Sequence, residues 1–184
     1  MSSSELSPVP HPIPQAQSHP IPPVFHADSR ILILGSFPSV RSREEGFFYG
    51  HPRNRFWQVL HLVFSQPEEG GGGELVPFPK TICQKKDFLL SHGIALWDVV
   101  ASCTVSGSSD SSIANVVPND ISPILSTASI SHIYTNGQKA HQLYCKYLQP
   151  ITGRQAICLP STSPANASRS LERLVDAWRQ IGER

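Results

Sequence analysis

Four short segments made up mainly of apolar residues, each bounded by small or polar residues, recur along the chain after residue 29. Mainly apolar segments of this length are typical of strands that are covered on both faces of a sheet. The runs predict strands at residues 30–34, 94–100, 130–134 and 155–159.

Between these runs the apolar residues return at helical spacing. Over residues 54–65 they fall at i, i+3, i+4, i+7 and i+8, which places them on one face of a helix. Periodicity and capping residues predict further helices over 81–91 before Gly93, from Asn119 or Asp120 through Leu125, over 138–148, and from about Ser168 onward. This alternation predicts an α/β fold of three α/β/α layers, with a central four-stranded parallel sheet covered by helices.

Three stretches lack either periodicity. Residues 1–29 are rich in proline, serine and histidine, and they predict a disordered tail ahead of a single domain at 30–184. A proline-rich docking site is the alternative to a passive extension. Small polar residues over 101–117 predict a long loop, a kind of segment that often carries function, and the glycine run at 70–73 predicts a flexible surface insertion.

Composition gives no indication of a strongly basic nucleic-acid-binding protein or of a metal-binding protein. The formal net charge of the 184 residues is +1, so no overall basic field indicates nucleic acid. Four arginines between residues 41 and 55 form a local cluster, which two glutamates offset and which is most simply solvated surface. The cysteines are scattered without a C-x-x-C pair, so we expect reduced thiols and no metal site.

Targeting signals and membrane spans are not evident in the sequence. The N-terminal region has no apolar core of a secretory signal, and no window is long and apolar enough to cross a bilayer. We therefore expect an intracellular protein of the cytoplasm, nucleoid or nucleus that makes no contact with a membrane.

Each predicted strand is followed by small or polar residues. These are Gly35 and Ser36 after the first strand, Asp98 within the second, residues 135–137 after the third, and residues 160–164 after the fourth. Parallel strands bring these segments to one edge of the sheet, which is where open α/β folds bind ligands. The candidate chemistry is therefore concentrated on that edge.

Asn54 and His51 stand near this edge, at the start of the first predicted helix. The amide of Asn54 can hold a water through its oxygen or stabilise a developing charge through its NH2 group, or it can cap the helix. His51 can act as a general acid or donate a hydrogen bond to a leaving group, or it can cap the turn. No second histidine lies at ligand spacing, which argues against a metal.

Four aromatic residues, Phe37, Phe47, Phe48 and Tyr49, lie between the first strand and this helix. They can stack on a planar base or close the core. The carboxylate of Asp98 can read the polar edge of a base, or it can bond backbone amides of its loop.

The remaining candidates are hydroxyls, and three familiar motifs are missing. Ser161 and Ser163 alternate with prolines and can hold phosphate oxygens, or form an ordinary turn. The glycine run lacks the Lys-Ser/Thr of a P-loop, no G-x-S-x-G elbow is present, and no G-x-G-x-x-G follows the first strand.

Five stretches in order carry a resemblance to a known family: residues 35–42, 49–57, 94–100, 134–137 and 159–165. In these stretches the chain resembles the uracil-DNA glycosylase superfamily, and most closely its hypoxanthine-DNA glycosylase branch. The resemblance runs from Ile31 to the end of the chain.

The resemblance implies a parallel four-stranded sheet, a base flipped out of DNA, and hydrolysis of its N-glycosidic bond. Phe37 stands where many branches have a catalytic Asp or Asn, and Leu159 stands where many have a histidine; in the hypoxanthine branch the catalytic amide matches Asn54. The base-binding residues implied are Gly35, Ser36, Phe37, Phe48, Tyr49 and Asp98. Those implied to bind DNA are Pro38, His51, Arg53, Ser161, Ser163 and Pro164.

The expected activity is that of a monofunctional, monomeric DNA glycosylase in base excision repair, without a cofactor. DNA containing deaminated bases is the expected partner, with hypoxanthine as the first substrate and uracil or xanthine as further ones. The alternatives are a DNA-lesion-binding module without catalysis and an enzyme that hydrolyses free nucleosides.

Overall fold

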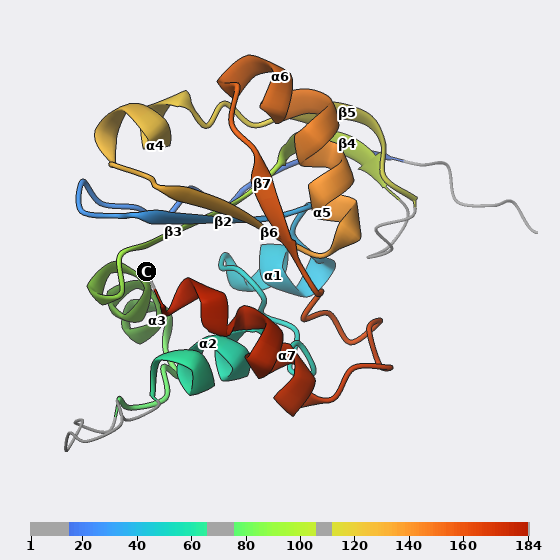
Figure 1. Ribbon diagram of the computed structural model, residues 1–184. Coiled ribbons are helices and arrows are strands. Elements are labelled where there is room, and N and C mark those ends of the chain that lie inside the picture. Colours follow the sequence, from blue (N-terminus) through green and yellow to red (C-terminus); the bar gives the residue numbers. More distant parts are fainter. Residues whose placement is uncertain (1–14, 66–75, 106–111, 184) are drawn as a thin grey trace, which may run out of the picture.

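A computed structural model describes residues 15–65, 76–105 and 112–183 (Figure 1). The central sheet has four parallel strands in the order β3-β2-β6-β7. Its strands are β2 (Ile31–Gly35), β3 (Ile94–Asp98), β6 (His132–Asn136) and β7 (Ala156–Leu159). The structure thus confirms the four-stranded parallel sheet that the apolar runs predict.

Helices cover both faces of this sheet (Figure 1). One face carries α2 (Phe56–Phe64), α3 (Ile82–Ser91) and α7 (Leu171–Trp178), and the other carries α4 (Ser122–Thr127) and α5 (Gln138–Leu143). Side chains of β2 alternate between the two cores: Ile31 and Ile33 pack with α2 and α7, whereas Leu32 and Leu34 pack against α4 and α5. The three-layer α/β/α architecture follows from this alternation.

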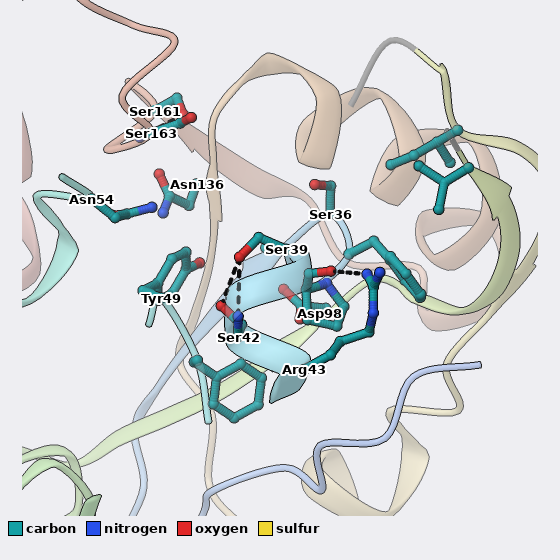
Figure 2. A pocket seen from close by; sticks show the side chains of 16 residues that line it. Ser36, Ser39, Ser42, Arg43, Tyr49, Asn54, Asp98, Asn136, Ser161 and Ser163 are labelled. Carbon is teal, nitrogen blue, oxygen red and sulfur yellow. Dashed lines mark hydrogen bonds between the residues drawn. The ribbon is translucent and has the colours of Figure 1, made fainter. Parts of the chain in front are cut away.

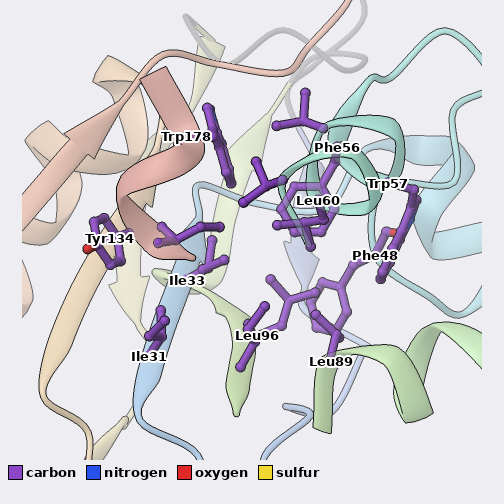
Figure 3. Close-up of a cluster of buried hydrophobic side chains, with 14 of the residues drawn as sticks. Ile31, Ile33, Phe48, Phe56, Trp57, Leu60, Leu89, Leu96, Tyr134 and Trp178 are labelled. Carbon is purple, nitrogen blue, oxygen red and sulfur yellow. The ribbon is translucent and has the colours of Figure 1, made fainter. Parts of the chain in front are cut away.

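The core beneath α2 and α7 is rich in aromatic side chains (Figure 3). Phe56 and Trp178 meet edge to face at 5.8 Å between ring centroids, and both are fully buried. The helical spacing over 54–65 correctly identifies the buried face of α2, while α2 itself begins at Phe56. This core holds the start of α2 firmly against the edge of the sheet.

A second sheet was not predicted. The strands β1 (Gln15–Ser18), β4 (Val100–Val105) and β5 (Ala114–Pro118) pair antiparallel in the order β1-β4-β5. The loop expected at 101–117 is therefore wrong for both of its ends, and residues 106–111 lie outside the described residues. Val100, Cys103 and Val105 bury their side chains while small polar residues face outward, so the half-buried pattern is easily mistaken for a loop.

The disordered tail expected at 1–29 is also wrong over residues 15–29, so the fold begins before residue 30. Ile21 and Val24 are buried, and Val24 exchanges backbone hydrogen bonds with Leu96 at 3.0 and 2.8 Å. Prolines are compatible with this role because an edge segment needs extended backbone and few donors. Residues 1–14 of the expected tail and the glycine run at 70–73 lie outside the described residues.

The shorter elements differ from the prediction mainly at their ends. Helix α1 (Val40–Glu45) was not predicted. α5 continues through a π-helical turn (Tyr144–Leu148) into α6 (Gln149–Thr152), and α7 begins at Leu171 and passes into a 3-10 turn (Arg179–Ile181). Within the described ranges, no helix has both the length and the apolar character needed to cross a membrane.

Candidate active site at the carboxyl edge of the parallel sheet

A cavity lies where the four parallel strands end (Figure 2). It encloses about 100 Å³, several times the roughly 10–15 Å³ that one water needs. Ten predicted site residues line it: Gly35, Ser36, Phe37, Pro38, Phe48, Tyr49, Asn54, Asp98, Ser161 and Ser163. The lining also includes six residues that were not predicted as site residues: Ser39, Ser42, Arg43, Val105, Ile113 and Asn136.

Gly35 and Asp98 form the floor of the cavity. They are register partners at the ends of β2 and β3, and a Cβ atom at Gly35 would overlap Asp98 Oδ1. Glycine at this position therefore allows the carboxylate to lie directly over the end of β2. This close approach explains why a small residue ends the first strand.

The carboxylate of Asp98 is held by a residue that the sequence did not indicate. Asp98 Oδ2 and His19 Nε2 are 2.8 Å apart, and the two side chains are 5% and 2% exposed. Asn119 Nδ2 donates to the backbone oxygen of Asp98 at 2.9 Å, so the backbone is fixed as well. Of the two roles considered for Asp98, binding of loop amides is not observed among the described residues. His19 gave no signal because it lies in the proline-rich segment.

Asn54 holds the start of α2, as the structural role considered for it requires, and its part in the chemistry stays a prediction. Its Oδ1 accepts from Phe56 N and from Thr162 Oγ1, each at 3.0 Å. Since a backbone N–H can only donate, the atom facing Phe56 N must be the oxygen, which fixes the orientation of the amide. The Nδ2 group has no hydrogen bond to another described residue, and Figure 2 shows it directed toward Asn136.

A short network joins Asn54 to the ends of β6 and β7. Asn136 Nδ2 donates to Thr162 Oγ1 at 2.9 Å, and Asn136 Oδ1 accepts from Thr162 N at 3.0 Å. The Thr162 hydroxyl in turn donates to Asn54, and Thr162 is fully buried. Asn136 is the last residue of β6, in a segment that the sequence places on this edge, whereas no feature of the sequence singled out Thr162.

The aromatic residues divide between core and cavity. Phe47 and Phe48 are 3% and 2% exposed, so they mainly close the core, although Phe48 also contributes to the cavity wall. Phe37 and Tyr49 are partly exposed. Tyr49 stacks on Phe56 at 3.9 Å between centroids, and its φ of 55° is unusual for a residue other than glycine.

Arg43 brings a positive charge to the cavity. Its guanidinium lies 5.4 Å from the centroid of the Phe37 ring and donates to Pro38 O at 2.6 Å. Burial raises the pKa of the nearby Cys103 thiol, and the charge on Arg43 opposes that rise. A carboxylate, a guanidinium and an amide thus surround one small space, which suits a planar ring with polar edges.

Arg55 was expected to lie on the solvated surface, but its side chain makes structural hydrogen bonds. Its guanidinium donates to the backbone oxygens of Ser163 at 3.4 Å, of Asn166 at 2.8 Å and of Arg169. Its backbone N–H donates to Thr162 O at 3.1 Å. The segment 160–169, called the C-terminal loop below, is therefore tied to the start of α2.

Three predicted residues do not line the cavity: His51, Arg53 and Pro164. His51 Nδ1 accepts from Arg53 N at 3.1 Å, which agrees with the turn-capping role. Arg53 is exposed and Pro164 is partly exposed, on the segments that flank the cavity. Their contact with DNA stays a prediction. In the described part of the chain, no group of three or more His, Cys, Asp or Glu side chains could hold a metal ion.

Known proteins resemble this chain in sequence. The model of the family described as "Uracil DNA glycosylase superfamily" matches residues 22–182. A protein of Methanosarcina acetivorans named hypoxanthine DNA glycosylase is 33% identical over 83% of this chain and 90% of its own length. One of the same name from Methanosarcina barkeri is 29% identical over 89% of this chain and 96% of its own length.

A similar structure has also been solved. It is a solution NMR structure from Methanosarcina acetivorans, described as a proposed uracil DNA glycosylase, with a TM-score of 0.71 and 30% identity. The match covers 91% of this chain and 99% of that one. The resemblance therefore extends over the sheet, the cavity and the C-terminal loop together.

Proposed function

The chain belongs to the uracil DNA glycosylase superfamily, and on that premise we propose that it is a DNA glycosylase that releases hypoxanthine from deoxyinosine in DNA. Two relatives with close to one-third identity carry the name hypoxanthine DNA glycosylase. The single observation that carries the proposal is the carboxylate of Asp98, held on the floor of a cavity that Asn54 borders.

The hydrogen-bonding character of Asp98 favours deaminated bases. An ionised carboxylate only accepts hydrogen bonds. Hypoxanthine presents N1–H beside a carbonyl, and xanthine N1–H and uracil N3–H have the same arrangement. Adenine presents a lone pair at N1, which a carboxylate repels. The cavity therefore suits hypoxanthine, with xanthine and uracil as weaker substrates of the same class.

Entry of the base requires that it leave the helical stack. Extrusion costs a few kcal/mol and is easiest for a mispaired base. Phe37 and Tyr49 present partly exposed rings on the cavity wall for stacking. Ser161, Ser163 and the neighbouring Pro164 lie on the C-terminal loop, where hydroxyls and backbone amides can hold phosphate oxygens while the proline enters the vacated space.

Bond cleavage follows from the position of Asn54. A water oxygen attacks C1′ as the bond from C1′ to the base breaks and its electron pair leaves with the base. The sugar has oxocarbenium character at this point. Because Oδ1 of Asn54 already accepts two hydrogen bonds, the amide holds the water by donation from Nδ2. The water's protons pass to the departing base and solvent, and an abasic site remains.

Such a site accelerates the reaction by orientation and electrostatics rather than by proton abstraction, because a neutral amide is a poor base. No lysine is among the described residues that line the cavity. Schiff-base chemistry and strand cleavage are therefore not expected, and the product is an intact strand with an abasic site.

The test uses labelled duplexes that contain deoxyinosine, deoxyuridine, deoxyxanthosine or only normal bases. Abasic sites are detected by alkaline strand cleavage under single-turnover conditions. Asn54→Ala should lower the rate on deoxyinosine by about 100-fold or more, because one positioned hydrogen-bond donor at a reacting centre is worth roughly that factor. Gln58→Ala, an exposed position on the same helix, is the matched control and should retain the rate.

Other outcomes would identify the alternative functions. Tight binding to inosine-containing DNA without base release would indicate a lesion-binding module. Cleavage of free inosine at a rate insensitive to salt would indicate a nucleoside hydrolase, since DNA binding weakens steeply as salt rises. An Asn54→Ala variant as active as the wild type would remove Asn54 from the mechanism.

A further inference from the structure

His19 is buried beneath the cavity although it precedes residues 22–182, the range that the family model matches. Its side chain is 2% exposed. The ring lies 6.0 to 6.2 Å, between centroids, from the rings of Phe37, Phe48 and Trp97. A polar ring placed in such a setting must have its hydrogen bonds satisfied, and the structure shows where they go.

Two hydrogen bonds fix which ring nitrogen of His19 carries the proton. Nδ1 accepts from the backbone N–H of Ile21 at 3.2 Å, so this nitrogen must present its lone pair. The proton of the neutral ring is then on Nε2, which donates to Asp98 Oδ2 at 2.8 Å. The backbone of Ile21 thus sets the tautomer, and the tautomer makes His19 a donor toward Asp98.

The backbone around His19 is itself held in place. His19 N donates to Ala101 O at 2.7 Å, and Trp97 Nε1 donates to Ile21 O at 3.1 Å. Val24 then pairs with Leu96 on β3, the strand that ends in Asp98. The ring of His19 therefore keeps a constant relation to the carboxylate it contacts.

The donation determines what Asp98 offers to a ligand. With Oδ2 engaged by Nε2–H, the carboxylate is fixed in rotation, and Oδ1 remains against Gly35 in the cavity. Oδ1 has no hydrogen bond to another residue that the structure describes. The oxygen that faces the cavity is thus left to accept a hydrogen bond from the ligand.

We propose that His19 is a specificity-determining positioning residue, which holds Asp98 as an acceptor and so restricts the cavity to bases with a ring N–H beside a carbonyl. This inference rests on the proposed function and deepens it. His19 acts through Asp98 and does not touch the base. Without the donation from His19, the carboxylate is free to rotate, and Oδ1 no longer keeps the position from which it accepts a ring N–H and repels the N1 lone pair of adenine.

The central experiment compares His19→Phe with His19→Gln. Phenylalanine fills the space without a donor, whereas the glutamine amide nitrogen reaches nearly the position of Nε2 and can donate. His19→Phe should lower kcat/KM on deoxyinosine by about 10- to 100-fold, the range expected when a hydrogen bond to a charged group is removed. The ratio of kcat/KM on deoxyinosine to that on deoxyadenosine should also fall in His19→Phe. His19→Gln should restore most of the kcat/KM on deoxyinosine and most of this ratio.

A double-mutant cycle separates positioning from general stability. If His19 acts only through Asp98, then His19→Phe added to Asp98→Ala should have no further effect on kcat/KM. His26→Phe is the matched control, because His26 lies in the same segment with a side chain that is 63% exposed. The inference is overturned if the effects of His19→Phe and Asp98→Ala multiply, or if His19→Gln fails to rescue while its melting temperature matches that of the wild type.

A spectroscopic measurement is independent of activity. The ¹⁵N chemical shifts of His19 in the full chain should show a protonated Nε2 and an unprotonated Nδ1, with an Nε2 proton that exchanges slowly. Asp98→Ala should make that proton exchange rapidly. A proton on Nδ1 would overturn the inference whatever the enzyme cleaves, whereas the expected spectrum in a protein inactive on every duplex would overturn the proposed function alone.

Discussion

At the scale of single residues, Asn54 holds part of the fold with one atom of its amide, and we propose that the other atom serves the chemistry. Its oxygen completes the first turn of α2 and accepts from Thr162. Its nitrogen has no hydrogen bond to another described residue, and we propose that it holds the attacking water. The amide group is rigid, so the hydrogen bonds that hold its oxygen also set the direction of its nitrogen. The contacts that stabilise the start of α2 therefore also orient the group that faces the cavity.

Thr162→Val tests this dependence. Valine has nearly the shape of threonine but removes the donor to Asn54 Oδ1 and the acceptor for Asn136 Nδ2. The loss should lower the single-turnover rate on deoxyinosine about 10-fold or more, since a buried unsatisfied polar group costs roughly 1–3 kcal/mol. The dissociation constant for DNA, measured by fluorescence anisotropy, should change little.

Thr162→Ser is the control for that experiment, because it keeps the hydroxyl and should retain nearly the full rate. A Thr162→Val enzyme as fast as the wild type would mean that the position of Asn54 does not depend on the network.

The sequence identified Asn54 but could not separate its two roles. A helix cap and a ligand-binding amide both call for Asn at the same place, and only the three-dimensional contacts show that Oδ1 is engaged in the fold while Nδ2 has no hydrogen bond to another described residue. Thr162 could not be found, because a threonine between serines in a proline-rich loop is indistinguishable from an ordinary turn residue. His19 could not be found either, because it lies in a proline-rich segment for which the sequence predicted a disordered tail.

At the scale of elements, the C-terminal loop is shaped by contacts outside itself. Arg55 donates to three of its backbone oxygens, and Trp178 Nε1 on α7 donates to Pro160 O at 3.0 Å. Within the loop, Asn166 Nδ2 donates to Ser161 O at 2.7 Å. The position of the residues proposed to hold the DNA strand therefore depends on Arg55, which is the next residue in the chain after Asn54.

Arg55→Leu should loosen this loop and weaken DNA binding. Leucine keeps part of the aliphatic packing and removes the donors to Ser163, Asn166 and Arg169. We expect the dissociation constant for inosine-containing duplex to rise about 10-fold or more. The free energy of unfolding should fall by about 2 kcal/mol, because a buried hydrogen bond from a charged group contributes roughly 1.5–3 kcal/mol and each of these partly exposed bonds contributes less. Amide hydrogen exchange over 160–169 should accelerate.

Arg30→Leu is the matched control, since Arg30 is exposed just before β2, at the opposite edge of the sheet. Equal DNA affinity and unchanged exchange in Arg55→Leu would contradict a role for Arg55 in ordering the loop.

The parallel strands were predictable and the antiparallel ones were not, for a physical reason. A strand covered on both faces is a continuous apolar run, which β2 and β3 show clearly. A strand such as β4 buries only Val100, Cys103 and Val105, and it pairs with the distant β1 as well as with β5. Its partner β1 lies 84 to 90 residues earlier, between prolines, where no local pattern reveals the pairing.

At the scale of the whole molecule, the segment 15–29 joins the two sheets. β1 pairs with β4 of the antiparallel sheet, and Val24 then pairs with β3 at the edge of the parallel sheet. His19 lies between these two attachments and reaches the floor of the cavity. The site is therefore assembled from the N-terminal segment, the ends of the parallel strands, the start of α2 and the C-terminal loop. Any change that releases the N-terminal segment should affect both stability and base recognition.

Val24→Asp, compared with Val117→Asp, tests whether the N-terminal segment is integral to the fold. Both substitutions replace valine with a carboxylate, but Val24 is 6% exposed and Val117 is 55% exposed. Burial of a valine side chain contributes about 1.5–3 kcal/mol, and burying an unpaired carboxylate adds a further cost. We expect Val24→Asp to lower the free energy of unfolding by about 3 kcal/mol and the melting temperature by roughly 6–12 °C, whereas Val117→Asp should stay within about 0.5 kcal/mol of the wild type.

Calorimetry measures both values, and equal melting temperatures for the two variants would mean that residues 15–29 are dispensable. A loss confined to Val24→Asp would instead show that the chain folds around its N-terminal segment, because the strand that it releases is the one ending in Asp98.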